Sequence, residues 1–326
     1  MAATGIPLNT TGMSPFRLSL KITLLSLGVI LLFCVSCHEK DPSKKDRSSD
    51  FAATPQTSPI TPGIVNEASG IADSRNFDGY IWTHQDSGFP SELFLVSKDG
   101  KNIKKYAVPD TDFLDWEDIT SGPGPQKDVN YLYIGDIGAN AHPFRQTCTI
   151  NRVREIGNPN DAFQPGSVEK IIFRYPDGPK DAETLLLDPV NLDLYVVSKE
   201  TSRVNLYRLP YPQAVGSEIT AELTGTIPGI KADGLPASLI TSPTSGDISF
   251  DGKEIVIKTY TTIYYWKRGN GQTIGEVLTQ PPHKTLPYFL EPEGTAICFD
   301  KKADGYFTLS EIGSAPAVTL NYYKRK

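Results

Sequence analysis

Five carboxylate residues stand at comparable points of a phrase that recurs along the chain. The marker acids are Glu67, Glu117, Glu183, Asp247 and Glu293. Carboxylates brought together repel one another, and burial disfavours their charged forms. A hard divalent cation such as Ca²⁺, which accepts about six to eight oxygen ligands, would offset that repulsion. Protonation, or pairing with Lys199 and Lys258, would offset it too. The pattern predicts a shared acidic site with Ca²⁺ as its candidate ion.

A second set of polar side chains follows the next segment of each copy. It comprises His84, Asp86, Asp136, Lys199, Lys258 and Glu311. Together with Glu117 and Asp118, these groups are expected to line a ligand-binding channel. A metal-bound water in that channel would need a general base, for which His84 and Asp86 are the catalytic candidates. Alternatively, the marker acids only cap backbone amides, because repeat proteins reuse structural residues in every copy. The variety of the second set argues against a purely structural role.

The recurring phrase has the length of one blade of a β-propeller. Successive marker acids are 50, 66, 64 and 46 residues apart, and a four-stranded blade typically takes about 40 to 50 residues. Residues 92–96 and 204–208 alternate apolar and polar side chains, as half-buried strands do. Asp99-Gly100 and Asp251-Gly252 are typical of hairpin turns. We therefore predict an all-β chain that folds as a single β-propeller, whose innermost strands bring the marker acids to one mouth of the central channel.

Closure of the ring is predicted from the two ends of the repeat region. Only 33 residues follow Glu293, too few for a complete last blade. The stretch Ser58–Val65 can supply the missing strand and so remove an open sheet edge. Five blades are expected, or six if a degenerate blade lies between Tyr211 and Pro243. The propeller is expected to span residues 63–326.

The start of the chain predicts export and lipidation. Residues 1–36 combine a basic beginning, an apolar run and a small residue ahead of Cys37, which is the order of a lipoprotein signal peptide. Lys21 leaves fewer than the about 20 apolar residues of a transmembrane helix, so an uncleaved anchor is the weaker alternative. Residues 37–62 are rich in Ser, Thr, Pro and charged residues, which predicts a flexible tether. A lipid on Cys37 would hold the protein at the cell envelope, at the outer membrane of a Gram-negative bacterium.

Charge and motifs limit the classes of partner. The chain of 326 residues carries a net charge of −6, whereas nucleic-acid-binding domains show a basic surface, so no nucleic-acid partner is expected. The sequence lacks Gly-x-Ser-x-Gly, His-Glu-x-x-His and the phosphate-binding loop, which leaves those enzyme classes unsupported. Cys148 and Cys298 lie in different repeats and are expected to be small core residues, not a disulfide.

Several of these stretches resemble a known family. The stretches are Glu67–Arg75, Trp82–Gly88, Asp115–Asp118, Tyr133–Gly138, Ala182–Leu185, Gly246–Ser249 and Lys258–Tyr260. They are similar to those of a family of secreted bacterial β-propellers, related to the TolB-like, NHL-like and "esterase-like phytase" propellers. The resemblance covers the chain from residue 63 to its end and implies the propeller fold in a lipoprotein member. It implies no agreed activity.

The expected function is that of an envelope-tethered lipoprotein whose propeller binds a ligand or acts as a scaffold. Its acidic channel would take the divalent cation. The alternative is a metal-dependent hydrolase that acts on a phosphoester or a lactone at the channel mouth. The expected partners are the membrane, reached through the lipid anchor, and a small molecule or an envelope protein.

Overall fold

The computed structural model describes residues 50–111, 114–139, 145–199, 203–230 and 242–326. The predicted signal peptide, the predicted lipidation residue Cys37 and residues 38–49 of the predicted tether lie outside these ranges. Within them, no helix is long and apolar enough to cross a lipid bilayer.

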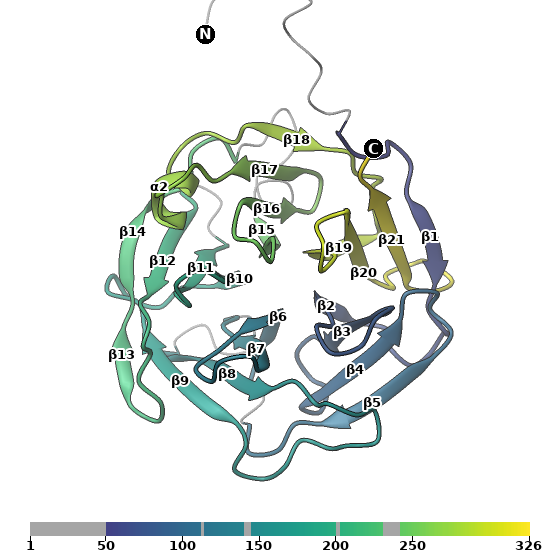
Figure 1. The fold of residues 1–326 in the computed structure, drawn as a ribbon, viewed down its shortest axis with the longest axis horizontal. Helices are drawn as coiled ribbons and strands as arrows, with labels where there is room; N and C mark the ends of the chain where they lie inside the picture. The colour runs from purple at the N-terminus through teal and green to yellow at the C-terminus, as the bar shows by residue number, and fades with distance from the viewer. Residues whose placement is uncertain (1–49, 112–113, 140–144, 200–202, 231–241) are drawn as a thin grey trace, which may run out of the picture. The chain divides into compact units, whose positions relative to one another are not determined.

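Five β-sheets form a ring (Figure 1), which confirms the predicted all-β propeller with five blades. Blade 1 contains β2 (Ala68–Asp73), β3 (Tyr80–Gln85), β4 (Glu92–Ser97) and β5 (Ile103–Ala107). Blade 2 contains β6 (Trp116–Pro123), β7 (Asn130–Asp136), β8 (Cys148–Arg154) and β9 (Glu169–Arg174), and β13 (Glu218–Thr220) adds a parallel strand to β9.

The remaining blades follow in chain order around the ring. Blade 3 contains β10 (Ala182–Leu187), β11 (Leu194–Ser198), β12 (Asn205–Leu209) and β14 (Glu222–Thr226). Blade 4 contains β15 (Pro243–Ile248), β16 (Glu254–Thr259), β17 (Ile263–Lys267) and β18 (Lys284–Leu286), with the short helix α2 (Ile274–Leu278) before β18. Blade 5 contains β19 (Glu293–Phe299), β20 (Gly305–Glu311) and β21 (Thr319–Lys324).

An N-terminal strand closes the ring, as predicted. Strand β1 (Gln56–Pro59) pairs with β21 and completes blade 5, with Gln56 opposite Tyr322. Phe51 forms a further bridge with Arg325. The closing strand begins earlier than the expected stretch, so residues that the sequence assigned to the tether pack with the propeller. Part of the interval considered for a sixth blade supplies β13 and β14 to its neighbours.

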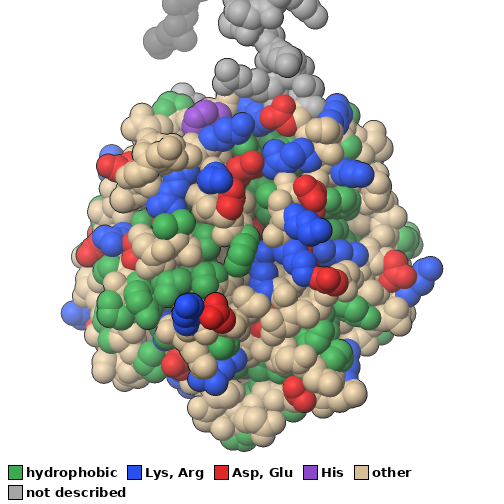
Figure 2. Space-filling view, viewed as in Figure 1, with side chains coloured by type: hydrophobic (Ala, Val, Ile, Leu, Met, Phe, Trp, Pro, Cys, Tyr) green, Lys and Arg blue, Asp and Glu red, His purple; other side chains and the backbone are tan. Residues whose placement is uncertain are grey.

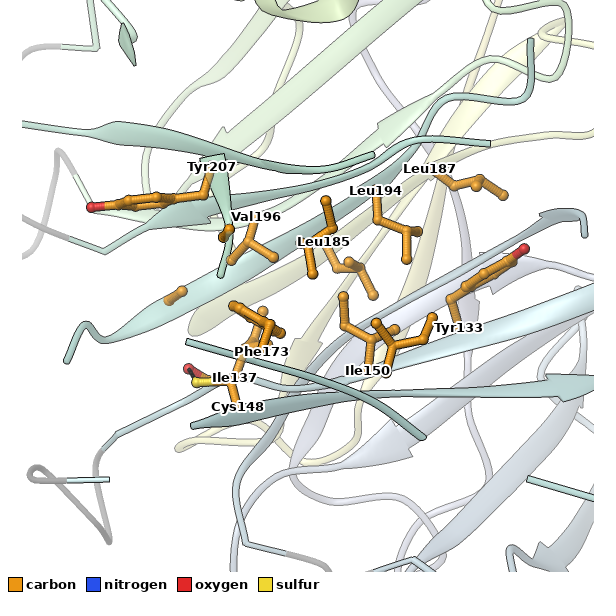
Figure 3. Close-up of a cluster of buried hydrophobic side chains, with 14 of the residues drawn as sticks. Tyr133, Ile137, Cys148, Ile150, Phe173, Leu185, Leu187, Leu194, Val196 and Tyr207 are labelled. Carbon is orange, nitrogen blue, oxygen red and sulfur yellow. Dashed lines mark hydrogen bonds between the residues drawn. The ribbon is translucent and has the colours of Figure 1, made fainter. Parts of the chain in front are cut away.

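Apolar side chains fill the space between neighbouring blades. Figure 3 shows one such cluster, in which Ile150 and Phe173 of blade 2 face Leu185 and Val196 of blade 3. Cys148 belongs to this cluster, and both Cys148 and Cys298 are buried free thiols, which confirms the expectation that they are core residues. On the face drawn in Figure 2, Lys and Arg side chains lie beside Asp and Glu side chains.

A β-bulge interrupts the innermost strand of every blade near its start. The pairing register shifts between Ala68 and Ile71, Trp116 and Asp118, Ala182 and Thr184, Pro243 and Ser245, and Gly294 and Ala296. The bulges therefore begin at Ser69, Glu117, Glu183, Thr244 and Thr295. Since a bulge changes where a side chain points, these positions decide which groups face the channel mouth.

Candidate functional site: the acidic mouth of the channel

The bulge register shows which acids are equivalent between blades. Two positions before each bulge stand Glu67, Asp115, Asp181, Ser242 and Glu293. This row contains two of the marker acids and adds Asp115 and Asp181, which sequence reasoning missed. The sequence does contain a pattern that points to them: each is the first residue of an Asp-x-Glu sequence whose Glu is a marker acid.

The bulge position itself is used in two ways. In three blades a hydroxyl there bonds to the innermost strand of the next blade: Ser69 Oγ donates to Glu117 O at 2.8 Å, Thr244 Oγ1 to Gly294 O at 3.2 Å, and Thr295 Oγ1 to Ala68 O at 2.6 Å. In blades 2 and 3 the same position holds Glu117 and Glu183. Two blades thus place a carboxylate where the others place an interblade hydrogen bond.

Three carboxylates from blades 1 and 2 converge at the mouth. Ligand oxygens of Asp86, Asp115 and Glu117 all lie within 4.8 Å of one another. Asp115 and Glu117 are buried and Asp86 is half-buried. The backbone N–H of Asp86 donates to Glu67 O at 2.8 Å, which fixes the chain at this point. We call these three residues the acidic triad.

Gly138 makes room for the acidic triad. It follows β7, and its backbone N–H donates to Asp115 O at 3.3 Å. A Cβ on this residue would stand 2.0 Å from Glu117 Oε1 and 2.6 Å from Asp115 Oδ2. Only glycine therefore lets this backbone approach the two carboxylates. Glu117 is 3% exposed, and its Oε1 has no hydrogen-bond partner among the described residues.

Burial and crowding raise the pKa values of two members of the acidic triad, Glu117 and Asp86, when no cation is bound. Burial raises the pKa of Glu117 well above its usual value, and the nearby Glu183, Asp86 and Asp115 carboxylates raise it further. Burial likewise raises the pKa of Asp86, against the opposing effects of the Ser87 N–H and the Lys199 ammonium. A bound cation would reverse both shifts.

Lys199 supplies a positive charge to the mouth from blade 3. Its ammonium pairs with Glu183 and lies 5.9 Å from the centre of the Tyr260 ring. Burial raises the pKa of Glu183 to about 8 despite this partner. Although burial disfavours the ammonium, Glu183 raises the pKa of Lys199. Lys199 is therefore charged at neutral pH and compensates part of the negative charge.

A second carboxylate group joins blades 1 and 5. Glu293 lies opposite Glu311 in the β19–β20 pair. Burial, hydrogen bonds with the Glu67 and Glu293 carboxyls and the charges of Glu293 and Asp86 together raise the pKa of Glu311 to about 9. Glu311 therefore holds a proton at neutral pH, between the Glu67 and Glu293 carboxyls.

Asp247 lies apart from the other marker acids. It is three positions beyond the bulge residue Thr244 and therefore deeper along the channel. Its carboxylate accepts hydrogen bonds from Thr120 Oγ1 at 3.5 Å and from Phe299 N at 2.9 Å. Burial raises its pKa to about 6. The expectation of five equivalent acids fails here because backbone pairing puts the bulge of this blade at Thr244, three residues before Asp247, whereas Glu117 and Glu183 stand at their bulges.

His84 is buried between blades 1 and 2. Its ring meets Trp116 edge to face, with 5.7 Å between the ring centres, and Nδ1 lies 3.1 Å from Gln85 O. Burial lowers the pKa of His84 to about 4, so the imidazole is neutral at physiological pH. Trp116 is fully buried. Of the two catalytic candidates, Asp86 is the one in the acidic triad.

Three other channel candidates hold strands together. Asp118 is fully buried, and its carboxyl accepts hydrogen bonds from Leu185 N and Ser245 Oγ, each at 3.0 Å, which links blades 2, 3 and 4. Burial raises its pKa well above the usual value. Asp136 accepts from the N–H groups of Leu114 and Asp115 at 3.2 Å and pairs with Arg145 at 2.6 Å. Asp136 thereby positions one member of the acidic triad.

Lys258 is the third of these groups. Its ammonium donates to Gly294 O at 2.5 Å and to Thr259 O at 3.2 Å, and it lies 4.6 Å from the centre of the Tyr288 ring. Burial lowers its pKa to about 8, against the charge of Glu291. The ammonium therefore joins blade 4 to blade 5 at Gly294, the second residue of β19.

Comparison with known proteins adds little beyond the fold. No protein-family model matches the chain, and no curated protein matches it. Among solved structures, the chain is similar to a luciferin-regenerating enzyme, with 11% identity, a TM-score of 0.44, and coverage of 83% of this chain and 95% of that one. It is also similar to U3-55K, with 9% identity, a TM-score of 0.38, and coverage of 78% and 67%.

A third similar structure is the PQQ-bound aldose sugar dehydrogenase from Streptomyces coelicolor. Its identity is 9% and its TM-score 0.43, with coverage of 85% of this chain and 100% of that one. Such TM-scores, all below 0.5, carry no inference about activity, and the five-bladed fold of this chain is established by its own strand pairing.

Proposed function

We propose that the propeller is a calcium-dependent ligand-binding domain whose ion is held by Asp86, Asp115 and Glu117. The observation that carries the proposal is the change of role at the bulge. In blades 1, 4 and 5 the residue at the bulge makes an interblade hydrogen bond. In blade 2 the bulge residue is Glu117, whose buried Oε1 has no hydrogen-bond partner among the described residues and whose carboxylate lies close to those of Asp86 and Asp115. A purely structural acid would not need such a departure from the repeat.

The donor set fits a hard divalent cation. All three groups offer carboxylate oxygens, the ligands that Ca²⁺ prefers, and none offers sulfur or imidazole nitrogen. Because Ca²⁺ accepts about six to eight oxygens, the acidic triad would leave coordination positions for water or for an oxygen of a ligand. The bound ion would thus both relieve the repulsion of the mouth and provide the attachment point for a small molecule or an envelope protein.

No described contact favours hydrolysis over binding. The imidazole of His84 lies against Trp116 and contacts Gln85 O, and Lys199 is paired with Glu183. Binding without turnover is therefore the function proposed.

Calcium titration of the cation-free protein tests this function. We expect binding of one ion by isothermal titration calorimetry and a rise in melting temperature, since a ligand that binds only the native state stabilises it. Glu117→Gln keeps the shape but removes the buried charge, and it should weaken binding by at least about tenfold, equal to about 1.4 kcal/mol.

Glu218→Gln is the matched control, because this acid lies on β13 at the outside of blade 2 and is 43% exposed. The control should bind calcium as the native protein does. Absence of calcium binding by the native protein, or equal affinities for native protein and Glu117→Gln, would refute the proposed site.

We further propose that a lipid on Cys37 tethers the propeller to the envelope, at the outer membrane of a Gram-negative cell. The support is the order of basic, apolar and small residues before Cys37. Cys37→Ser is expected to move the protein from the membrane fraction to the soluble fraction, while calcium binding stays unchanged. Retention of the variant in the membrane after salt and carbonate washing would contradict lipidation.

A further inference from the structure

Two adjacent apolar side chains project from the segment between β18 and β19. Phe289 is 71% exposed and Leu290 is 62% exposed, and Phe289 is the most exposed large hydrophobic residue that the structure describes. An exposed pair of this kind costs solubility, and contiguous apolar surface commonly marks an interaction site.

Hydrogen bonds hold the segment that presents the pair. Tyr306 Oη donates to Pro287 O, and the Phe289 N–H donates to Tyr323 Oη at 2.8 Å. The Glu291 carboxylate accepts from Tyr288 Oη at 3.1 Å and from Asn321 Nδ2 at 2.8 Å. The backbone is thus ordered before any partner arrives, so little conformational entropy remains to be lost on contact.

The apolar pair lies beside the strand through which the N-terminal tether enters the propeller. Thr57 of β1 donates through Oγ1 to Asn321 Oδ1 at 3.0 Å, and Asn321 in turn holds Glu291. Thr57, Phe289 and Leu290 also line one cavity of about 220 Å³. Strand β1 therefore passes beside these side chains.

The length of the tether limits the distance to its anchor. Residues 37 and 50 are 13 positions apart, so even a fully extended chain spans only roughly 45 Å. Basic groups surround its entry point. Lys284 hydrogen-bonds the Asp50 carboxylate at 2.6 Å, and this contact, with the charges of Lys267 and Arg325, lowers the pKa of Asp50. Lys267 is exposed and available to an anionic lipid headgroup.

We propose that Phe289 and Leu290 insert into the lipid surface and orient the propeller on the membrane. The proposal rests on the proposed lipidation of Cys37. The lipid anchor confines the propeller near the bilayer, which raises the effective concentration of the apolar pair at that surface. Aromatic and aliphatic side chains on a fixed loop enter the interfacial zone, while Lys267 at the entry of the tether can contact the headgroups.

Lipid-borne quenching tests the orientation. Lipidated full-length protein is placed on vesicles of phosphatidylethanolamine and phosphatidylglycerol that contain a nitroxide-labelled lipid. Ser314→Cys carries a fluorophore one residue before Ala315, which lines the same cavity as Phe289 and Leu290. Ser217→Cys is the matched control in the segment before β13, across the ring (Figure 1). The native thiols Cys148 and Cys298 are buried and should not react.

We expect quenching at 314 to exceed that at 217 by at least about threefold, and Phe289→Ser with Leu290→Ser to remove the difference. If quenching is equal at both positions while the protein still floats with the vesicles, membrane insertion of the apolar pair is refuted. The lipid anchor on Cys37 is then still supported. Failure to float would overturn the anchor and the insertion together, without touching the calcium site.

Discussion

A Gly138→Ala variant is expected to lose calcium binding and part of its stability together. The new Cβ would stand 2.0 Å from Glu117 Oε1 and 2.6 Å from Asp115 Oδ2, distances that no real contact tolerates. Either the backbone after β7 or both carboxylates must move, and the three ligand oxygens can no longer converge. We expect calcium affinity to fall at least about 100-fold, about 2.7 kcal/mol, and the fold to lose about 1–3 kcal/mol, as overpacked sites do.

The measurement pairs calorimetric titration with thermal unfolding, and Gly157→Ala is its control. A Cβ at Gly157 would meet nothing within 4 Å, so this variant carries the same chemical change without the crowding. It should bind calcium normally and melt at the native temperature or slightly above. Normal calcium affinity in Gly138→Ala would show that the acidic triad does not hold the ion.

Without calcium, the propeller is expected to become less stable as the pH rises from about 6 to about 9. Burial raises the pKa of Glu183 to about 8 and that of Glu311 to about 9, whereas glutamate in an unfolded chain titrates near about 4.3. Between these values the folded state holds protons that the unfolded state has released. Because the folded state binds more protons, the free energy of unfolding falls with rising pH in this window.

The expected loss is about 1–2 kcal/mol, after allowing for the partial exposure of Glu311 and for the Lys199 partner of Glu183. This corresponds to a melting temperature lower by about 2–8 °C. Thermal unfolding in a chelator from pH 6 to pH 9 measures the slope, and Glu311→Gln should flatten it. Saturating calcium should restore most of the stability at pH 9. A melting temperature that is constant or rises over this range would contradict the assigned protonation.

The architecture follows from local features of the sequence. Alternating strands, Asp-Gly turns and a repeat of about one blade length each constrain neighbouring residues, and such constraints remain visible without coordinates. Closure of the ring was also predictable, because the segment after Glu293 is one strand too short for a blade and the segment before Glu67 contains one additional strand. The sequence also identified most of the acidic mouth, since each blade places its acids near the start of an innermost strand.

The composition of the site was decided by the tertiary structure. A bulge adds one residue to a strand and shifts every later side chain relative to its partner. Asp247 stands three residues beyond the bulge of its strand, whereas Glu117 stands at the bulge of its own, where the fold brings Asp115 and Asp86 to it. Burial between blades makes His84 neutral, and the missing side chain of Gly138 lets the acidic triad form. These are properties of packed neighbours far apart in the chain, which no single repeat encodes alone.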